Sequence, residues 1–288
     1  MKKVLSLTMT IMLLLAMLCI PSVADANVPV ESVTAYVTIS DKDGNLVLQQ
    51  EAISVTDIDR DGKLTINDAL YLAHEAKYEG GAEAGYASSV GQYGRSIDKL
   101  WGTANGGAYG YYLNHISCSN LDTELTDGGY VNAFVYTDLN TWSDQYSYFD
   151  INTATIEKNG TLTLTLKYAG YDDQWNPVVL PVAGATILLN GTETAYKTDA
   201  DGKVTVTLDQ VGALVVSAKS ATMTLVPPVC KVMVTGDETP VTPTADNENE
   251  SDTVDSKTVT TVCVVAAVII AIGAIAAVIA KKKNGNEK

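Results

Sequence analysis

One segment, from Asp57 to Asp68, restricts the possible folds of this chain more than any other stretch. It reads D-I-D-R-D-G-K-L-T-I-N-D, with aspartates at its first, third, fifth and twelfth positions and glycine at its sixth. Glycine permits a sharp turn, so the first three carboxylates can point their oxygens at one centre. After this loop, apolar residues recur at a spacing of three to four, which predicts a helix over residues 67–78.

The loop has the ligand spacing of a calcium-binding EF-hand loop. The expected ligands are the carboxylates of the loop, one backbone carbonyl and one hydroxyl: Asp57, Asp59, Asp61, Lys63, Thr65 and Asp68. Asp68 is shorter than the glutamate usual at the last position, and in this respect the segment resembles the calcium loops of dockerin modules. The alternative is a solvated turn that caps the helix. Asp199–Gly202 looks similar, but it runs directly into an alternating strand pattern, so we predict a hairpin turn there.

The two ends of the chain predict where the protein is located. Residues 1–26 combine Lys2 and Lys3, an apolar run and a small-residue cleavage pattern, which is typical of a secretory signal peptide. Residues 258–280 are apolar and uncharged, long enough to cross a bilayer, and three lysines follow them. By the positive-inside rule, residues 281–288 are then a cytoplasmic tail. We therefore expect a single-pass cell-membrane protein, anchored by its own helix, with an extracellular N-terminus.

Charge and cysteine content limit the possible partners. The chain has 34 acidic and 19 basic side chains, and six of the lysines lie at its two ends, so the part between them is strongly acidic. Binding to nucleic acid requires basic patches and is not expected. Cys118 and Cys230 are the cysteines that could pair outside the cell; a bridge is possible, although two free buried thiols are the preferred interpretation.

The first part of the expected ectodomain, residues 27–151, contains a β-rich hairpin over residues 33–48, the loop at 57–68, and later a region rich in aromatics and glycine. Trp101-Gly102, the run Y-G-Y-Y-L-N over 109–114, and L-T-D-G-G-Y-V over 125–131 resemble the transcobalamin-like C-terminal domain of secreted bacterial proteins. That resemblance implies a β-grasp-like α+β fold and suggests corrinoid binding. The calcium loop within it suggests the surface of a Gram-positive anaerobe.

If this domain binds a ligand, we expect the binding surface among the aromatic and polar residues of this region. The candidate ligand-binding residues are Trp101, Tyr109, Tyr111, Tyr112, Asn114 and His115. They could form a flat stacking surface for a ring or a sugar. The alternative is that alternate members fill a β core, where aromatic residues are common. The other histidine, His74, lies on the expected helix and is interpreted as a surface or packing residue.

Residues 152–234 change to alternating Thr, Val and Leu, as in T-L-T-L-T-L over 161–166 and in residues 203–208. This part resembles the carboxypeptidase-regulatory-like or transthyretin-like sandwiches of bacterial surface proteins, which implies an Ig-like β-sandwich without catalysis. Residues 235–257 contain prolines and acidic residues with few apolar ones, so they are expected to form a disordered stalk. The expected fold class is mainly β with one principal helix: a β-grasp-like domain, a β-sandwich and one transmembrane helix.

No residue pattern in the sequence favours catalysis. His115 and Cys118 are close along the chain and are the sharpest candidates for a thiol nucleophile and its base, yet no family signature surrounds them. The preferred hypothesis is a non-catalytic module, stabilised by calcium, that binds a corrinoid or another small molecule. The alternative is a structural adhesin or spacer whose partner is an extracellular protein or a glycan. Exposure or burial of the aromatic residues distinguishes the two.

Overall fold

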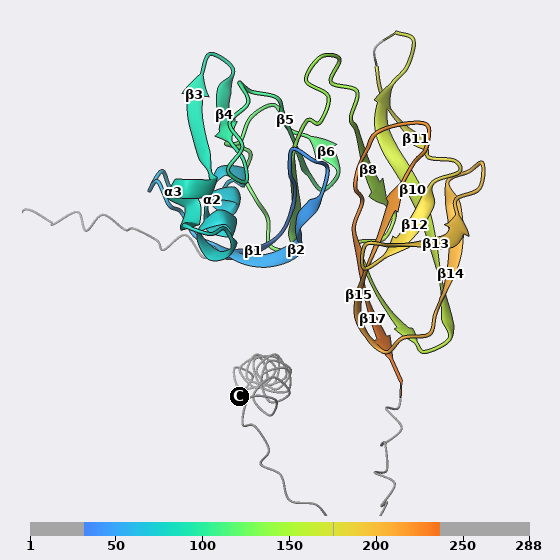
Figure 1. The fold of residues 1–288 in the computed structure, drawn as a ribbon. Coiled ribbons are helices and arrows are strands. Elements are labelled where there is room, and N and C mark those ends of the chain that lie inside the picture. The colour runs from blue at the N-terminus through green and yellow to red at the C-terminus, as the bar shows by residue number, and fades with distance from the viewer. Residues whose placement is uncertain (1–31, 175, 237–288) are drawn as a thin grey trace, which may run out of the picture. The chain divides into compact units, whose positions relative to one another are not determined.

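The computed structural model describes residues 32–174 and 176–236 (Figure 1). The expected signal peptide, most of the stalk and the expected membrane segment at 258–280 lie outside the described residues. Among the residues that are described, no helix is long and apolar enough to span a membrane. The structure is mainly β, as expected, with α2 (Ile66–Lys77) as its principal helix and the short α3 (Gly81–Gly85) after it.

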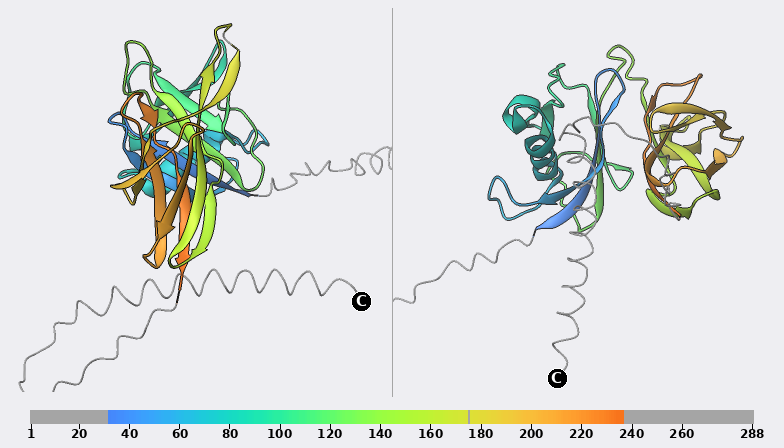
Figure 2. Two further views of the ribbon diagram at one scale, coloured as in Figure 1. Left: turned by 90° about the vertical axis from the view of Figure 1, so that its right-hand side faces the viewer. Right: turned by 60° about the horizontal axis from the view of Figure 1, so that its bottom comes forward.

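The first sheet has the strand order β2-β1-β7-β5-β6. Strands β1 and β2 form an antiparallel hairpin, β1 runs parallel to β7, and β7 runs antiparallel to β5. Figure 2 shows α2 on one face of this sheet. The strands are β1 (Val33–Ser40), β2 (Leu46–Val55), β5 (Tyr109–Leu113), β6 (Ile116–Ser117) and β7 (Gly129–Val135), and a separate hairpin contains β3 (Ala87–Gly91) and β4 (Gly94–Lys99).

Helix α2 forms where the sequence predicts it. Its first turn carries capping residues, and its apolar residues share one face. Thr65 is the N-cap and forms a capping box with Asp68, which satisfies backbone donors of the first turn. Leu70 and Ala73 are fully buried against the sheet, while Lys77 is outside the stripe and forms an ion pair with Glu51 at 2.6 Å. Burial of the apolar stripe therefore fixes the helix, and with it the loop that precedes it, on the sheet.

The remaining strands form two further sheets that enclose a second hydrophobic core. In one sheet β11, β10, β8 and β16 are neighbours and β14 also pairs with β10; the other sheet has the order β13-β12-β15-β17-β9. The bounds are β8 (Gln145–Phe149), β10 (Gly160–Tyr171), β11 (Pro177–Pro181), β14 (Lys203–Leu208), β16 (Leu225–Val226), β9 (Thr153–Glu157), β12 (Thr186–Leu189), β13 (Thr192–Lys197), β15 (Gly212–Lys219) and β17 (Cys230–Thr235).

Strand β8 belongs with this second group, although the sequence placed residues up to 151 with the first. It pairs with β10 through Leu166 and Phe149, and Phe149 is part of the second core. The start of the second group of sheets therefore moves from residue 152 to before Gln145. The alternating strands expected at 161–166 and 203–208 do pair with each other, and every second residue along β14 is buried. That alternation is the pattern of a strand with one face in a core.

Candidate metal centre

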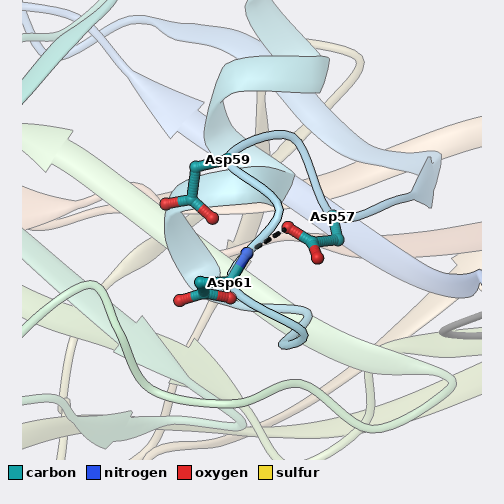
Figure 3. A group of neighbouring side chains, drawn as sticks. All are labelled: Asp57, Asp59 and Asp61. Carbon is teal, nitrogen blue, oxygen red and sulfur yellow. Dashed lines mark hydrogen bonds between the residues drawn. The ribbon is translucent and has the colours of Figure 1, made fainter. Parts of the chain in front are cut away.

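The loop between β2 and α2 is folded around its first aspartate. Asp57 Oδ1 accepts hydrogen bonds from the backbone amides of Arg60 at 2.6 Å and Asp61 at 3.2 Å, and its Oδ2 accepts from Gly62 at 2.9 Å. Figure 3 shows the contact between Asp57 and the Asp61 amide. The carboxylate of Asp57 thus closes the turn by itself, with partners three, four and five residues further on.

Two residues of this turn adopt left-handed backbone conformations. Arg60 has φ +62° and Gly62 has φ +86°. A Cβ built at Gly62 would meet no atom within 4 Å, so the backbone conformation, and not lack of space, explains the glycine. The sequence-based expectation that glycine enables the sharp turn agrees with this geometry.

Three carboxylates converge at the loop. Asp57, Asp59 and Asp61 each offer one oxygen, and these oxygens lie within 4.8 Å of one another (Figure 3). Asp57 is half-buried, whereas the other two are exposed. All the donors are oxygens, and two of the three carboxylates are open to solvent, which suits a hard cation such as Ca²⁺ that coordinates six to eight oxygens, water included. The donor set therefore fits the metal that the sequence motif implies.

The other three expected ligands are placed differently. The Nζ atom of Lys63 forms an ion pair with Glu124 at 2.9 Å. The group that the motif would use at this position is the backbone carbonyl of Lys63. Asp68 is almost fully buried: its Oδ2 accepts from the amide and the hydroxyl of Thr65, both at 2.7 Å, and its Oδ1 accepts from the Ile58 amide at 3.1 Å. The structure therefore brings Asp57, Asp59 and Asp61 together, while Thr65 and Asp68 bond to each other as a helix cap.

Electrostatics within the loop differ between neighbouring carboxyl groups. Hydrogen bonds from backbone amides, that of Gly62 foremost, lower the pKa of Asp57. Burial raises the pKa of Asp59, and the negative charges of Asp61 and Asp68 raise it further. A guanidinium from outside the loop, Arg95, acts in the opposite direction on Asp59. The carboxylates of the loop therefore repel one another, and Arg95 partly offsets this repulsion at Asp59.

Arg95 and its second partner, Asp122, were not predicted from the sequence. Arg95 Nη2 lies 3.2 Å from Asp59 Oδ2, and its Nε lies 2.8 Å from Asp122 Oδ1. Neither residue is within the motif, and Asp59 and Arg95 are 36 positions apart. No local spacing signals such a contact, because it depends on how β4 folds back beside the loop.

The second acidic turn joins two strands, but the predicted hairpin is wrong, because β13 and β14 on either side of it pair with other strands in different sheets. Asp199 Oδ1 accepts from the amides of Asp201 at 3.0 Å and Lys203 at 2.8 Å, and Asp199 N donates to the Lys203 carbonyl at 2.8 Å. Its partners are therefore two and four residues away, unlike those of Asp57. Asp41 bonds in the same way to Asp43 and Asn45. The two patterns separate a strand-joining turn from the candidate metal loop despite similar sequences.

The expected ligand-binding aromatics are divided between two environments. Trp101, Tyr109 and Tyr111 pack with the core under α2. The Trp101 ring lies 5.2 Å from the ring of His74, which is fully buried in this core and is not a surface residue. Tyr109 Oη also bonds to the carbonyls of Asp98 and Thr103, each at 2.9 Å. These contacts are those of structural residues.

The other three expected ligand residues lie elsewhere. The Tyr112 ring stacks on that of Tyr146, with ring centres 3.7 Å apart and planes at 11°. His115 stacks on Tyr148 at 4.2 Å, and its two nitrogens contact Tyr146 Oη at 3.0 Å and Asn152 Oδ1 at 3.2 Å. Asn114 is exposed, and its Oδ1 accepts from the backbone amide of Tyr130. The six residues thus form no single exposed surface.

Tyr112 and His115 do line a cleft of about 200 Å³ beside β11. Its other walls come from β6, from the end of β10 and from the start of β11, and they are mainly apolar. Sites for drug-sized ligands measure about 300–1,000 Å³. The volume of this cleft is therefore below the range of sites for drug-sized ligands.

The proposed thiol and base are not paired with each other. Both nitrogens of His115 contact other groups, and Cys118 Sγ donates to the carbonyl of Ile116 at 3.5 Å. Burial raises the pKa of Cys118 above its ordinary value and raises that of Cys230 to about 12, so both groups stay as thiols at neutral pH. The two cysteines are free, as the sequence interpretation favoured.

Comparison with known proteins adds little to this description. No protein-family model and no curated protein matches the chain. Among solved structures, domains 4 and 5 of the S-layer protein SbsC match with 18% identity and a TM-score of 0.23, covering 52% of this chain and 80% of that one. The D0-D1 domain of intimin matches with 19% identity and a TM-score of 0.23, covering 51% and 76% respectively.

A third solved structure, the N-terminal Ig1-2 module of the Drosophila receptor protein tyrosine phosphatase DLAR, matches with 12% identity and a TM-score of 0.20, covering 52% of this chain and 75% of that one. With TM-scores this low, the three similarities establish no shared architecture, and no functional conclusion is drawn from them.

Proposed function

We propose that the chain is a non-catalytic, calcium-stabilised module of the cell surface that serves as an adhesin or spacer and binds an extracellular protein or a glycan. The observation that carries the proposal is the convergence of Asp57, Asp59 and Asp61 on a turn that Asp57 itself closes. Calcium bound there would link the end of β2 to the start of α2. Because the unfolded chain has no such site, binding energy would add directly to folding stability.

The calcium role rests on which residues are free to bind the ion. Asp59 and Asp61 are exposed, and the three amides that bond to Asp57 leave about one of its four lone-pair positions open. Lys63 and Thr65 would contribute a carbonyl and a hydroxyl by the motif's pattern. Asp68 would exchange part of its bonding to Thr65 for the ion. The ion itself supplies charge compensation and no chemistry on a substrate.

An adhesin or spacer is better supported than small-molecule capture. The first sheet, with β1 parallel to β7 and α2 across one face, is consistent with the β-grasp resemblance at the level of fold. The aromatic residues that would hold a flat ligand are instead packed against His74, Tyr146 and Tyr148. The cleft that Tyr112 and His115 line, about 200 Å³, is small for a corrinoid. Corrinoid binding is therefore an outcome to be tested and not the preferred function.

Location at the surface is part of the proposal. The apolar segment at 258–280, with the lysines after it, would anchor the chain in the membrane once, and the stalk at 235–257 would extend from it. The strong acidity of the chain between its ends favours solubility and divalent cations over nucleic acid.

The test is the effect of calcium on thermal unfolding of the double variant Asp57→Ala/Asp59→Ala. In the wild-type protein, calcium should raise the melting temperature relative to chelator, and in the variant that rise should disappear. The matched control is Asp199→Ala/Asp201→Ala, which removes two aspartates from a turn of similar sequence but with a different bonding pattern. A calcium-induced rise retained in the Asp57/Asp59 variant, or lost in the control, would contradict the assignment of the site.

A further inference from the structure

Arg95 is the one basic side chain in the described residues that forms an ion pair with a carboxylate of the candidate metal loop. It lies in β4, and its side chain is 23% exposed. The guanidinium lies between two carboxylates: Nη2 is 3.2 Å from Asp59 Oδ2, and Nε is 2.8 Å from Asp122 Oδ1. A positive charge is therefore already present beside the third position of the loop.

The backbone around Arg95 fixes this charge near the loop. The amide of Leu121 donates to the carbonyl of Arg95 at 3.0 Å. Further along the same segment, the amide of Leu125 donates to the Leu64 carbonyl at 2.8 Å, and the Ile66 amide donates to the Thr123 carbonyl at 3.1 Å. Residues 121–125 thus connect β4 to the loop and the first turn of α2 through backbone hydrogen bonds.

We propose that Arg95 is an internal counter-cation that sets the calcium affinity of the loop, an inference that rests on the calcium role proposed above. Without metal, the guanidinium compensates the charge of Asp59 and weakens the repulsion among the three converging carboxylates. With calcium bound, the guanidinium and the ion repel each other and compete for the same carboxylate. Arg95 therefore stabilises the metal-free loop and makes calcium binding weaker than the aspartates alone would allow.

The geometry favours this role over that of an outer partner that orients Asp59 for the metal. Charge-assisted N–H···O bonds are shortest at about 2.7–2.9 Å, and the contact with Asp122 falls in that range. The contact with Asp59, at 3.2 Å through one nitrogen, is longer. Asp122 therefore holds the guanidinium in place, and Arg95 acts on Asp59 mainly through its charge. The two roles predict opposite signs, because loss of an orienting partner weakens metal binding.

The experiment measures calcium binding calorimetrically in wild-type protein and in Arg95→Gln, with melting temperatures in chelator recorded for both. Arg95→Gln should bind calcium on the order of tenfold more tightly at low ionic strength, with a smaller gain at physiological salt because exposed charges are screened. In chelator the variant should melt at a lower temperature than wild type. Arg95→Lys retains the charge and should bind calcium as wild type does.

The control for net charge is Lys219→Gln. Lys219 forms an ion pair with Glu193 on the second group of sheets, so this variant makes the same charge change at a site that shares no contact with the loop. Its calcium affinity should equal that of wild type. Equal tightening in both variants would assign the effect to net charge and overturn a specific role for Arg95.

Failure of the two proposals can be told apart. If wild type binds calcium saturably and Arg95→Gln binds it equally or less tightly, the role of Arg95 is wrong while the calcium site stands. Weaker binding by Arg95→Lys would show that the guanidinium fork, and not its charge, matters, and would likewise overturn the inference. If neither wild type nor Arg95→Gln gives saturable heat with calcium, the proposed calcium role is wrong and the inference falls with it.

Discussion

His74 accepts a hydrogen bond at Nε2 from the backbone amide of Trp101, at 3.1 Å. Because an amide N–H can only donate, Nε2 carries no proton, and the proton is on Nδ1, which donates to the carbonyl of Leu70 at 2.6 Å. The neutral ring thus joins α2 to the segment after β4 within the core. A second proton on this ring would oppose the Trp101 amide, which gives the fold a dependence on pH.

The free energy of unfolding should therefore decrease as the pH falls below the pKa of an ordinary histidine, 6.5. Burial lowers the pKa of His74 from 6.5 to about 4. Between these values the unfolded chain binds the proton and the folded chain does not, so the free energy of unfolding rises with pH over this window. The full effect is up to about 3 kcal/mol. Urea unfolding of wild type and His74→Gln at pH 7 and 5.5 checks it, and an equal loss of stability in both proteins would contradict it.

Gly110 in β5 should not tolerate alanine. A Cβ at this position would lie 2.1 Å from Cζ of Phe134, a fully buried ring on the neighbouring strand β7. We expect Gly110→Ala to lower the free energy of unfolding by about 1–3 kcal/mol, the range for overpacking a core. Gly91→Ala is the control, since its Cβ would meet only the Gly94 carbonyl oxygen at 3.9 Å. Denaturant unfolding of both variants measures the difference; equal stability would show that the ring moves aside.

The hydroxyl of Tyr109 should contribute measurably to the free energy of unfolding. It accepts from the amide of Asn105 at 3.1 Å and contacts the carbonyls of Asp98 and Thr103, and the side chain is 9% exposed. Tyr109→Phe leaves these groups without their partner and should cost about 1–3 kcal/mol. Tyr93→Phe, at a side chain that is 84% exposed, should be neutral. If Tyr109→Phe also unfolds like wild type, water replaces the hydroxyl and the contacts carry no net stability.

The stacked pair Tyr112 and Tyr146 should be energetically coupled. Their ring planes are nearly parallel, and Tyr146 belongs to a small cluster with Phe134 and Val226. In a double-mutant cycle with leucine at both positions, we expect a coupling energy of about 0.5–1.5 kcal/mol beyond the single losses. A coupling energy near zero would mean that burial alone, and not the stack, holds the rings.

Local sequence patterns predicted those elements that are determined by residues close together along the chain. The candidate metal loop is specified by a spacing of twelve residues, and α2 begins where Thr65 and Asp68 can cap it. The strand that follows Asp199 was recognised from its alternating pattern, although its partner is β10 and not the strand before the turn. In each case the residues that decide the structure are close together along the chain.

Contacts that depend on distant segments could not be predicted in this way. Tyr111 and Tyr112 must point to opposite faces of β5, since successive strand residues alternate, but nothing local says that Tyr146 covers one of them. For the same reason β8 was assigned to the wrong neighbours, because its pairing with β10 is set by the fold. The ion pair between Asp59 and Arg95 is a third case.

A calorimetric titration of the purified full chain with calcium, beside the Asp57→Ala/Asp59→Ala variant, measures directly whether the loop binds the ion. We expect saturable heat with one ion per wild-type chain, no saturable heat in the variant, and wild-type behaviour for Asp199→Ala/Asp201→Ala. Absence of saturable heat in the wild-type protein, or unchanged binding in the Asp57/Asp59 variant, would contradict a calcium site built on Asp57, Asp59 and Asp61.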